Sequence, residues 1–364
     1  MPKTKEIVSL TKQLIRFKTT SDNYSELKKC INFIEKYFSG CDVIIKSYEV
    51  NKKPSLVITF KKTKKPELFL VGHIDVVPAD DGQFKPIIKS GRLYGRGALD
   101  NKVSVAIIMV LMKHYSGKKQ KPDIGLMITA DEEVGSRNGV EYLLKKQNYS
   151  AGFSLVLDAG ERYEIVTKEK GALHLKLSAR GKDAHGSKPW KGDNAIDKLL
   201  DFYLDLKKRF PKTTKDNRWK RTINLGVIKG GSVANKVPDY AEMWLDMRFI
   251  SDKEKNNIMG MIKRTKWIKS EILTDAKVMN TNKYNRYVRA LKRSIEEVTK
   301  KKTKFRKAHG ATDARFFAEK MVPTALIVPI GHNIHAKGEY VELKSVGKVH
   351  DILNQFIVDN IKKV

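Results

Sequence analysis

Acidic and imidazole side chains recur in this sequence directly after apolar runs. The first case is the stretch LFLVGHID, in which His73 and Asp75 follow the apolar residues 68–71. Side chains two apart in a strand point to the same face, so these two would lie together at the strand's carboxyl end. A histidine that binds a metal usually has its other ring nitrogen held by a carboxylate or carbonyl. The pair fits a metal ligand with its orienting group, and equally a structural hydrogen-bonded pair.

Four further segments place acids or histidines after apolar runs or glycine-rich turns. They carry Asp100 in GRLYGRGALDNK, residues 131–133 in ITADEEVGS, Asp158 in LVLDAGE, and His332 and His335 in IVPIGHNIHAKGE. Taken singly, Asp100 could be a helix N-cap, residues 131–133 a solvated acidic turn, and one of the two histidines a surface residue. Three consecutive carboxylates repel one another, however, unless a cation lies among them.

Taken together, these residues favour a divalent-ion centre. Two imidazoles with three carboxylates are donors that suit zinc or a related ion. Five protein ligands exceed the need of one catalytic zinc, which keeps a position open. They suit two ions that share a carboxylate and a water.

Alternating strands and helices must position these side chains. Apolar residues recur at helical spacing in residues 5–18, 25–38 and 101–115, and strand-like runs separate and follow them. This alternation predicts an α/β sheet covered by helices on both faces. Sites in such folds form at the carboxyl ends of the strands, where the acids and histidines fall.

The pattern changes near residue 170. A half-exposed strand begins there and is followed by a helix, two strands, a helix and a strand, in the segments 194–210, 222–230, 241–249, 252–268 and 271–279. The order β-α-β-β-α-β is the ferredoxin-like arrangement. We therefore predict a catalytic α/β domain, residues 1–169 and 283–364, that is interrupted by an inserted α+β domain at 170–282.

The length and composition of the chain limit the number of domains and the cellular location that we expect. The 364 residues suit two domains, and the two cysteines, Cys30 and Cys41, imply no disulfide framework. A reducing, cytoplasmic location is the simplest expectation. The N-terminal stretch MPKTKEIVSL has no signal-peptide core, and the longest apolar run, 103–112, is too short to span a bilayer. No membrane association is expected.

The formal net charge of +31 raises the question of nucleic-acid binding. The lysines are scattered along the chain, in runs such as 61–65, 118–121 and 300–307, and no nucleic-acid-binding motif accompanies them. We therefore expect a solvated basic surface and no specific nucleic-acid partner.

Seven motifs in order resemble a single family over nearly the whole chain. They are GHIDVVP, GRGALDNK, ADEEVGS, AHGSKPWKGDNA, GGSVANKVPDYAEMWLDMR, HGATDARF and GHNIHAKGE. The series resembles the co-catalytic dizinc amidohydrolases and peptidases, which include succinyl-diaminopimelate desuccinylase, acetylornithine deacetylase, aminoacylase, carboxypeptidase G and the dipeptidases. The resemblance implies that the inserted domain is a lid that also forms a homodimer.

The resemblance also implies a ligand set. His73 and Asp158 would bind one ion, Glu133 and His335 the other, and Asp100 both. The expected cofactor is two divalent ions, with zinc first and cobalt or manganese as alternatives.

Other roles follow from the same likeness. Asp75 would orient His73, and Glu132 would be the general base that moves the water's proton to the leaving amine. Neighbouring glutamates can differ in role because successive side chains point in different directions. A cis peptide bond is implied at Asp100–Asn101.

In the inserted domain, the resemblance implies that His185 stabilises the oxyanion, often from the partner subunit. Asn235 and Arg248 would bind a substrate carboxylate, for which an arginine offers two donors. A salt bridge to Asp246 is the alternative for Arg248. Thr312, in HGATDARF, would also touch substrate.

Small departures leave the subgroup open. The family often has His-Ser-Ser where this chain has His185-Gly186-Ser187, and desuccinylases tend to carry Glu at the position of Asp158. The expected function is hydrolysis of the amide bond in a small, carboxylate-bearing N-acyl amino acid, of the desuccinylase or acetylornithine deacetylase type. The alternatives are a dipeptidase or carboxypeptidase of the same family and, in another class, a non-catalytic binding protein.

Overall fold

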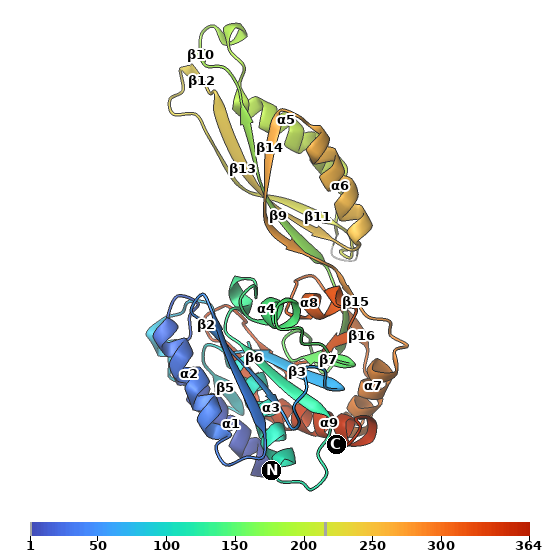
Figure 1. Cartoon of the computed structure of the whole chain (residues 1–364). Coiled ribbons are helices and arrows are strands. Elements are labelled where there is room, and N and C mark those ends of the chain that lie inside the picture. The colour runs from blue at the N-terminus through green and yellow to red at the C-terminus, as the bar shows by residue number, and fades with distance from the viewer. Residues whose placement is uncertain (1, 215–216) are drawn as a thin grey trace. The chain divides into compact units, whose positions relative to one another are not determined.

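The computed structural model describes residues 2–214 and 217–364, which form two compact units (Figure 1). Unit 1 comprises Met1–Lys168, Asn280–Ala308 and Thr312–Val364, and unit 2 comprises Glu169–Met279 with His309–Ala311. The short segment 309–311 was expected in the catalytic domain and instead groups with unit 2.

Unit 1 is built on a mixed β-sheet. Among the described residues the sheet has nine strands. In spatial order they are β1 (Ile44–Val50), β2 (Lys53–Thr59), β6 (Ile124–Thr129), β3 (Leu68–His73), β7 (Phe153–Val156), β17 (Thr324–Leu326), β8 (Ile165–Glu169) and β15 (Met279–Asn280), with β16 (Phe305–Ala308) paired to β8. Strand β3 runs parallel to both β6 and β7, so the carboxyl ends of these three strands meet at one edge of the sheet.

Helices pack on both faces of this sheet, as its sequence pattern predicts. They are α1 (Pro2–Arg16), α2 (Tyr24–Tyr37), α3 (Lys102–Ser116), α4 (Val140–Lys145), α7 (Arg286–Thr299), α8 (Ala314–Glu319) and α9 (Leu343–Asn360). Leu68 and Leu70 of β3 belong to the core that includes α3, whereas Phe69 contacts Phe317 of α8. Because alternate residues of a strand face opposite sides, these contacts place helices on each face.

A small antiparallel sheet lies at the start of α3. It orders β18 (Gly331–His332), β19 (Tyr340–Glu342), β5 (Arg92–Tyr94) and β4 (Ile87–Lys89). The pairing of β19 with β5 brings the residues before β19 beside the turn that leads from β5 into α3. That turn carries Asp100.

Unit 2 has the predicted ferredoxin-like order. Its four-stranded sheet runs β11 (Thr222–Gly230), β13 (Tyr240–Phe249), β9 (Gly171–Arg180) and β14 (Ile268–Ala276). Helices α5 (Ala195–Lys208) and α6 (Asp252–Arg264) contact this sheet, and a separate two-stranded ribbon pairs β10 (Ala184–His185) with β12 (Lys236–Val237).

One predicted boundary in unit 2 is wrong. The helix expected over 252–268 ends at Arg264, and the strand expected over 271–279 begins at Ile268. Ile268 is largely buried and pairs with Ala179 of β9. The residues around Ile268 continue the helical pattern of the sequence, but pairing with β9 places them in a strand. Tertiary contacts here outweigh the local preference.

Candidate metal centre

The edge where β3, β6 and β7 end gathers most of the ionisable residues singled out in the sequence. His73 is the last residue of β3 and pairs with Thr129 of β6, so Asp131, Glu132 and Glu133 follow β6 at the same level. Asp158 follows β7, whose Val156 pairs with Val71. The sheet register thus brings together residues that are far apart in sequence.

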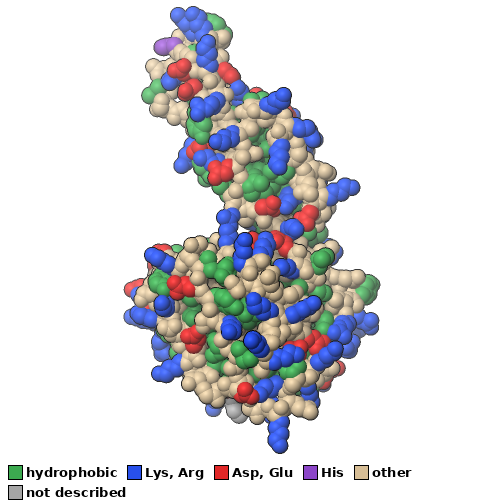
Figure 2. All heavy atoms as spheres, viewed as in Figure 1, with side chains coloured by type: hydrophobic (Ala, Val, Ile, Leu, Met, Phe, Trp, Pro, Cys, Tyr) green, Lys and Arg blue, Asp and Glu red, His purple; other side chains and the backbone are tan. Residues whose placement is uncertain are grey.

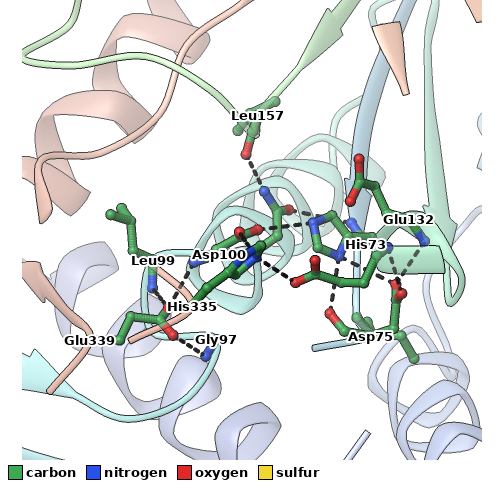
Figure 3. A network of polar contacts seen from close by, with 12 residues as sticks. His73, Asp75, Gly97, Leu99, Asp100, Glu132, Leu157, His335 and Glu339 are labelled. Atoms are coloured by element: carbon green, nitrogen blue, oxygen red, sulfur yellow. Dashed lines mark hydrogen bonds and ion pairs between the residues drawn. The ribbon is translucent and has the colours of Figure 1, made fainter. Parts of the chain in front are cut away.

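Asp100 lies between two imidazoles (Figure 3). Its Oδ1 is 3.1 Å from Nε2 of His73, and its Oδ2 is 3.2 Å from Nε2 of His335. Two donors that each bind zinc at about 2.0–2.1 Å are about 3.3 Å apart at a tetrahedral angle. Both spacings of Asp100 therefore suit one ion on each side of a shared carboxylate.

The remaining donors complete two groups of three. Within each group the donor atoms lie within 4.8 Å of one another, in the sets His73, Glu132, Asp158 and Asp100, Glu133, His335. Imidazole nitrogen and carboxylate oxygen are the donors expected for zinc or a similar divalent ion, so the residues fit the implied cofactor. Glu132, predicted as a base, lies beside the first pair of ligands.

Asp75 contacts three residues at this edge of the sheet. Its buried carboxylate lies 3.3 Å from Nδ1 of His73. It also accepts hydrogen bonds from the backbone N–H groups of Glu132 at 3.1 Å and Glu133 at 3.0 Å. The Asp75 backbone carbonyl also lies 3.1 Å from Nδ1 of His73, so this residue holds the ring of a proposed ligand through its backbone and its side chain, and the peptide units of two glutamates through its carboxylate.

The carboxylates of the centre favour positive charge on the neighbouring imidazoles. Burial lowers the pKa of His73, but the Asp100 and Asp75 carboxylates outweigh it and raise that pKa well above its usual range. Contacts with Asp100 and Glu133 raise the pKa of His335 to about 10. The same carboxylates would attract bound cations, which would supply positive charge at this position.

Glu132 has a different environment from an ordinary surface glutamate. Burial is the largest cause, followed by the charge of Asp158, and together they raise the pKa of Glu132 well above its usual range. A general base that takes a proton from water needs a higher pKa than an ordinary carboxylate has, and the surroundings of Glu132 shift its pKa in that direction.

Sequence reasoning gave no role to two buried residues of the centre. The side chain of Asn101 accepts from the His73 backbone N–H and donates to the Leu157 carbonyl, which ties the ends of β3 and β7. The Asp100–Asn101 peptide bond is cis, as the resemblance implies. Glu339 accepts from the turn that carries Asp100. Both residues fall inside quoted motifs, but nothing in their local sequence shows what they contact.

The two candidate histidines of the late motif are separated by the fold. His332 is exposed, and its ring packs against Tyr340 at 5.8 Å between centroids. His335 instead reaches Glu133, with 3.0 Å between Nε2 and Oε1.

Thr312, predicted to touch substrate, lies in unit 1, where its hydroxyl accepts a hydrogen bond from the Ala314 N–H at the start of α8.

Two of the predicted residues of unit 2 lie together. His185 is exposed in β10, and its Nδ1 is 2.8 Å from the Ser187 hydroxyl. The next residue, Gly186, donates its N–H to the Asn235 carbonyl at 2.6 Å. The β10–β12 ribbon therefore places His185 and Asn235 on adjoining segments.

Arg248 forms the salt bridge with Asp246 that the sequence offered as the alternative to binding a substrate carboxylate. Its Nε and Nη2 donate to the two oxygens of Asp246 at 2.7 and 3.0 Å. His174 also approaches Asp246, at 3.4 Å. A substrate carboxylate at Arg248 would have to share or replace this partner.

No helix in the described part of the chain has the length and apolar character needed to cross a bilayer. Basic side chains are spread over the visible surface of each unit rather than confined to one element (Figure 2).

Comparison with known proteins decides the family. The model of peptidase family M20/M25/M40 matches residues 69–359. The chain belongs to this family. Members are metal-dependent hydrolases, and the M20 assignment makes this chain one as well.

Relatives and solved structures agree with the M20 assignment. The chain is 29% identical to succinyl-diaminopimelate desuccinylase of Pelagibacter ubique, over 98% of this chain and 99% of that protein. Its fold matches a tripeptidase from Staphylococcus aureus (TM-score 0.80, 20% identity, 97% of each chain). It also matches the aminopeptidase PepT from Bacillus cereus (TM-score 0.79, 19% identity, 97% of this chain and 98% of that one). The α/β fold with its inserted domain is thus that of M20 enzymes.

Proposed function

We propose that this M20 hydrolase uses two divalent ions to cleave the amide bond of a small, carboxylate-bearing N-acyl amino acid. The observation that carries the proposal is the position of Asp100, whose two oxygens lie 3.1 and 3.2 Å from the imidazoles of His73 and His335. A carboxylate that reaches two separate ligand groups is the arrangement needed to share one residue between two ions.

The roles of the surrounding residues are those that the family resemblance implies, and the grouping of their donor atoms supports them. His73 and Asp158 would hold one ion, Glu133 and His335 the other, and Asp100 both. The bound ions would activate a water for attack on the amide carbonyl. Glu132 would accept the proton of that water and return it to the leaving amine, while Asp75 keeps His73 and the glutamates in place. Zinc is the first candidate, and cobalt and manganese are the others.

The substrate class rests on likeness and on candidate side chains in both units. The Pelagibacter ubique relative is named a succinyl-diaminopimelate desuccinylase, which makes a succinylated or acetylated amino acid the first candidate. Asn235 and Arg248 would bind its carboxylate, and Thr312 would contact it too. A dipeptide or tripeptide is the second candidate, because solved structures with this fold include a tripeptidase.

A homodimer through unit 2 is supported by an open sheet edge. Strand β11 is at the end of the unit 2 sheet and exposes Val227 and Ile228. Helix α5 exposes Leu200 and Leu204 one turn apart and contacts β11. Among the described residues β11 pairs on one side only, with β13, and a free strand edge beside exposed apolar side chains is a surface that a second copy could cover. His185 would then act in the partner's site.

Two other readings receive less support. A non-catalytic binding protein has no need of a half-buried glutamate beside its ligands, such as Glu132. A specific nucleic-acid partner would need concentrated positive charge, whereas the basic residues are spread over each unit (Figure 2). The free cysteines Cys30 and Cys41 are consistent with a cytoplasmic location.

A substrate panel tests the function. Metal-free protein would be reloaded with zinc, cobalt or manganese and assayed on N-succinyl-diaminopimelate, N-acetylornithine, other N-acyl amino acids, dipeptides and tripeptides. The proposal expects metal-dependent release of a free amine, with the highest kcat/KM on an N-acyl amino acid. A preference for peptides would move the chain to the dipeptidase alternative. Hydrolysis of none of these, in protein with both ions bound, would contradict the proposed reaction.

A further inference from the structure

Glu339 is a buried carboxylate whose two oxygens are both fully engaged. Its exposed fraction is 1%. Oε1 accepts from the backbone N–H groups of Leu99 at 2.8 Å and Asp100 at 3.0 Å, and Oε2 accepts from Gly97 N–H at 3.0 Å and from Nη1 of Arg96 at 2.6 Å. Four donors from one short turn thus converge on a single side chain, and Figure 3 shows Glu339 beside Gly97, Leu99 and Asp100.

That turn also has backbone hydrogen bonds, from Arg96 N–H to the Gln83 carbonyl at 2.8 Å and from Ala98 N–H to the Gly95 carbonyl at 3.0 Å, but the N–H groups of Gly97, Leu99 and Asp100 point to Glu339. The turn joins β5 to α3, and Gly97 within it has a φ of +82°. A Cβ at Gly97 would lie 2.8 Å from Cδ of the buried Lys102 side chain, so the backbone passes close to its neighbours. Consecutive N–H groups that point inward need an acceptor, because a buried donor without one costs free energy. Glu339 is that acceptor.

Glu339 also connects the segments of two proposed ligands. It accepts from the N–H of Asp100 itself, and it follows His335 by four positions, immediately before β19. The side chains of Asp100 and His335 meet at 3.2 Å. Their relative position therefore depends on the link between the turn and the strand, which the Glu339 carboxylate supplies together with the β19–β5 pairing.

We propose that Glu339 is a positioning residue that sets the affinity of the centre for its ions, by holding the Asp100 turn against the segment that carries His335. This inference rests on the proposed two-ion centre. Glu339 is buried and donates nothing to that centre directly, so it acts through Asp100. Outer hydrogen-bond partners of metal ligands typically change metal affinity about 10- to 100-fold when replaced.

Glu339→Gln is the sharpest variant. It keeps the shape of the side chain but replaces one acceptor oxygen with an NH₂ group, which would face an N–H donor of the turn. Glu339→Asp is the second variant, since it keeps the charge and shortens the reach. The matched control is Glu67→Gln. Glu67 is a largely buried carboxylate of the same unit that accepts from an arginine, a hydroxyl and a backbone N–H, outside the candidate centre.

Titration calorimetry with Zn²⁺ and Co²⁺ on the metal-free full-length proteins measures the effect. We expect Glu339→Gln to bind the ions about 10- to 100-fold more weakly, Glu339→Asp to be weakened in the same direction, and Glu67→Gln to bind as wild type does. Saturating metal should restore most of kcat in the Glu339 variants, because this side chain does not reach substrate.

Three results would overturn the inference. Unchanged affinity in the Glu339 variants, with only a lower melting temperature, would make the residue merely structural. An equal loss in Glu67→Gln would show a general effect of instability. Normal affinity with a kcat that saturating metal does not restore would give Glu339 some other role. Failure of the wild-type protein to bind any divalent ion would instead overturn the proposed metal centre, which separates the two failures.

Discussion

The backbone N–H of Glu132 donates to the Asp75 carboxylate, with 3.1 Å between N and Oδ1. The same carboxylate lies 3.3 Å from Nδ1 of His73. Asp75 therefore links the ring of a proposed ligand to the backbone of the proposed base. The His73 ring also contacts the Asp75 backbone carbonyl at 3.1 Å, so the carboxylate acts on the ring together with the backbone.

Asp75→Asn should lower both metal affinity and turnover. An amide can accept one of the two backbone N–H groups through its oxygen, but its NH₂ would face the other. We expect a loss of roughly 10- to 100-fold, as for other groups that orient metal ligands. Calorimetry and steady-state kinetics measure the two effects separately. Wild-type values for both would show that the backbone holds Glu132 and His73 without Asp75.

The contacts of Asp100 with both imidazoles predict how its replacement changes metal binding. Because Asp100 approaches both His73 and His335, Asp100→Ala should weaken binding of both ions rather than one. Metal analysis after dialysis against limiting zinc would measure the stoichiometry, which is expected to be up to two ions per wild-type chain. A chelator should abolish hydrolysis, and added zinc should restore it. Full activity in exhaustively metal-free protein would contradict the mechanism.

Alanine substitutions of the two neighbouring glutamates should have different effects on kcat and on metal content. Glu132→Ala should lower kcat by about 10²- to 10⁴-fold while both ions remain, because it removes the proton acceptor. Glu133→Ala should lose metal at one site, since the Glu133 carboxylate lies 3.0 Å from Nε2 of His335. Metal content and kcat would be measured on the same preparations. Loss of metal in Glu132→Ala with an active Glu133→Ala would mean that the two roles are reversed.

His185 should matter for turnover and not for metal. His185→Ala is expected to lower kcat by about 100- to 1000-fold with metal content unchanged, because a donor to the developing oxyanion is removed. If the chain dimerises through unit 2, mixing His185→Ala with Glu132→Ala should restore part of the activity, since one site of the heterodimer would have both residues. Sedimentation establishes the oligomer. A monomer, or no rescue despite verified subunit exchange, would exclude action across the dimer.

Lys102 predicts a pH effect on stability. It is fully buried, its Nζ donates to the Phe17 carbonyl at 2.7 Å, and burial lowers its pKa from 10.5 to about 8. Between pH 8 and 10.5 the unfolded state binds this proton and the folded state does not, so the free energy of unfolding rises with pH there. The gain is lost as the pH falls towards 8.

The measurement compares wild type with Lys102→Met in urea unfolding of metal-free protein from pH 7.5 to 10.5. Relative to the variant, wild type should gain up to about 3 kcal/mol across this range. The exposed Lys119 offers the control, and Lys119→Met should keep the wild-type slope. Parallel profiles for wild type and Lys102→Met would mean that Lys102 stays charged in the folded protein.

Short-range patterns in the sequence determined the order of elements and the composition of the site. The helical spacing before residue 116 predicts α3, and the β-α-β-β-α-β order of unit 2 is readable from alternating periods. The motifs also place acids and histidines after apolar runs, and the M20 match agrees with them. These properties depend on neighbouring residues, so they are visible without a structure. The boundary between α6 and β14 is not visible in the sequence, because the pairing of β14 with β9 determines it.

Only the tertiary structure decided which distant residues meet. His332 and His335 are three positions apart and equally plausible in sequence, but His332 packs on Tyr340 while His335 reaches Asp100. Glu339 looks like any loop acid until four N–H donors of a turn more than 200 residues away converge on it. Strand register and turn shape set such contacts. They arise from the packing of the whole unit, and no local stretch of sequence contains them.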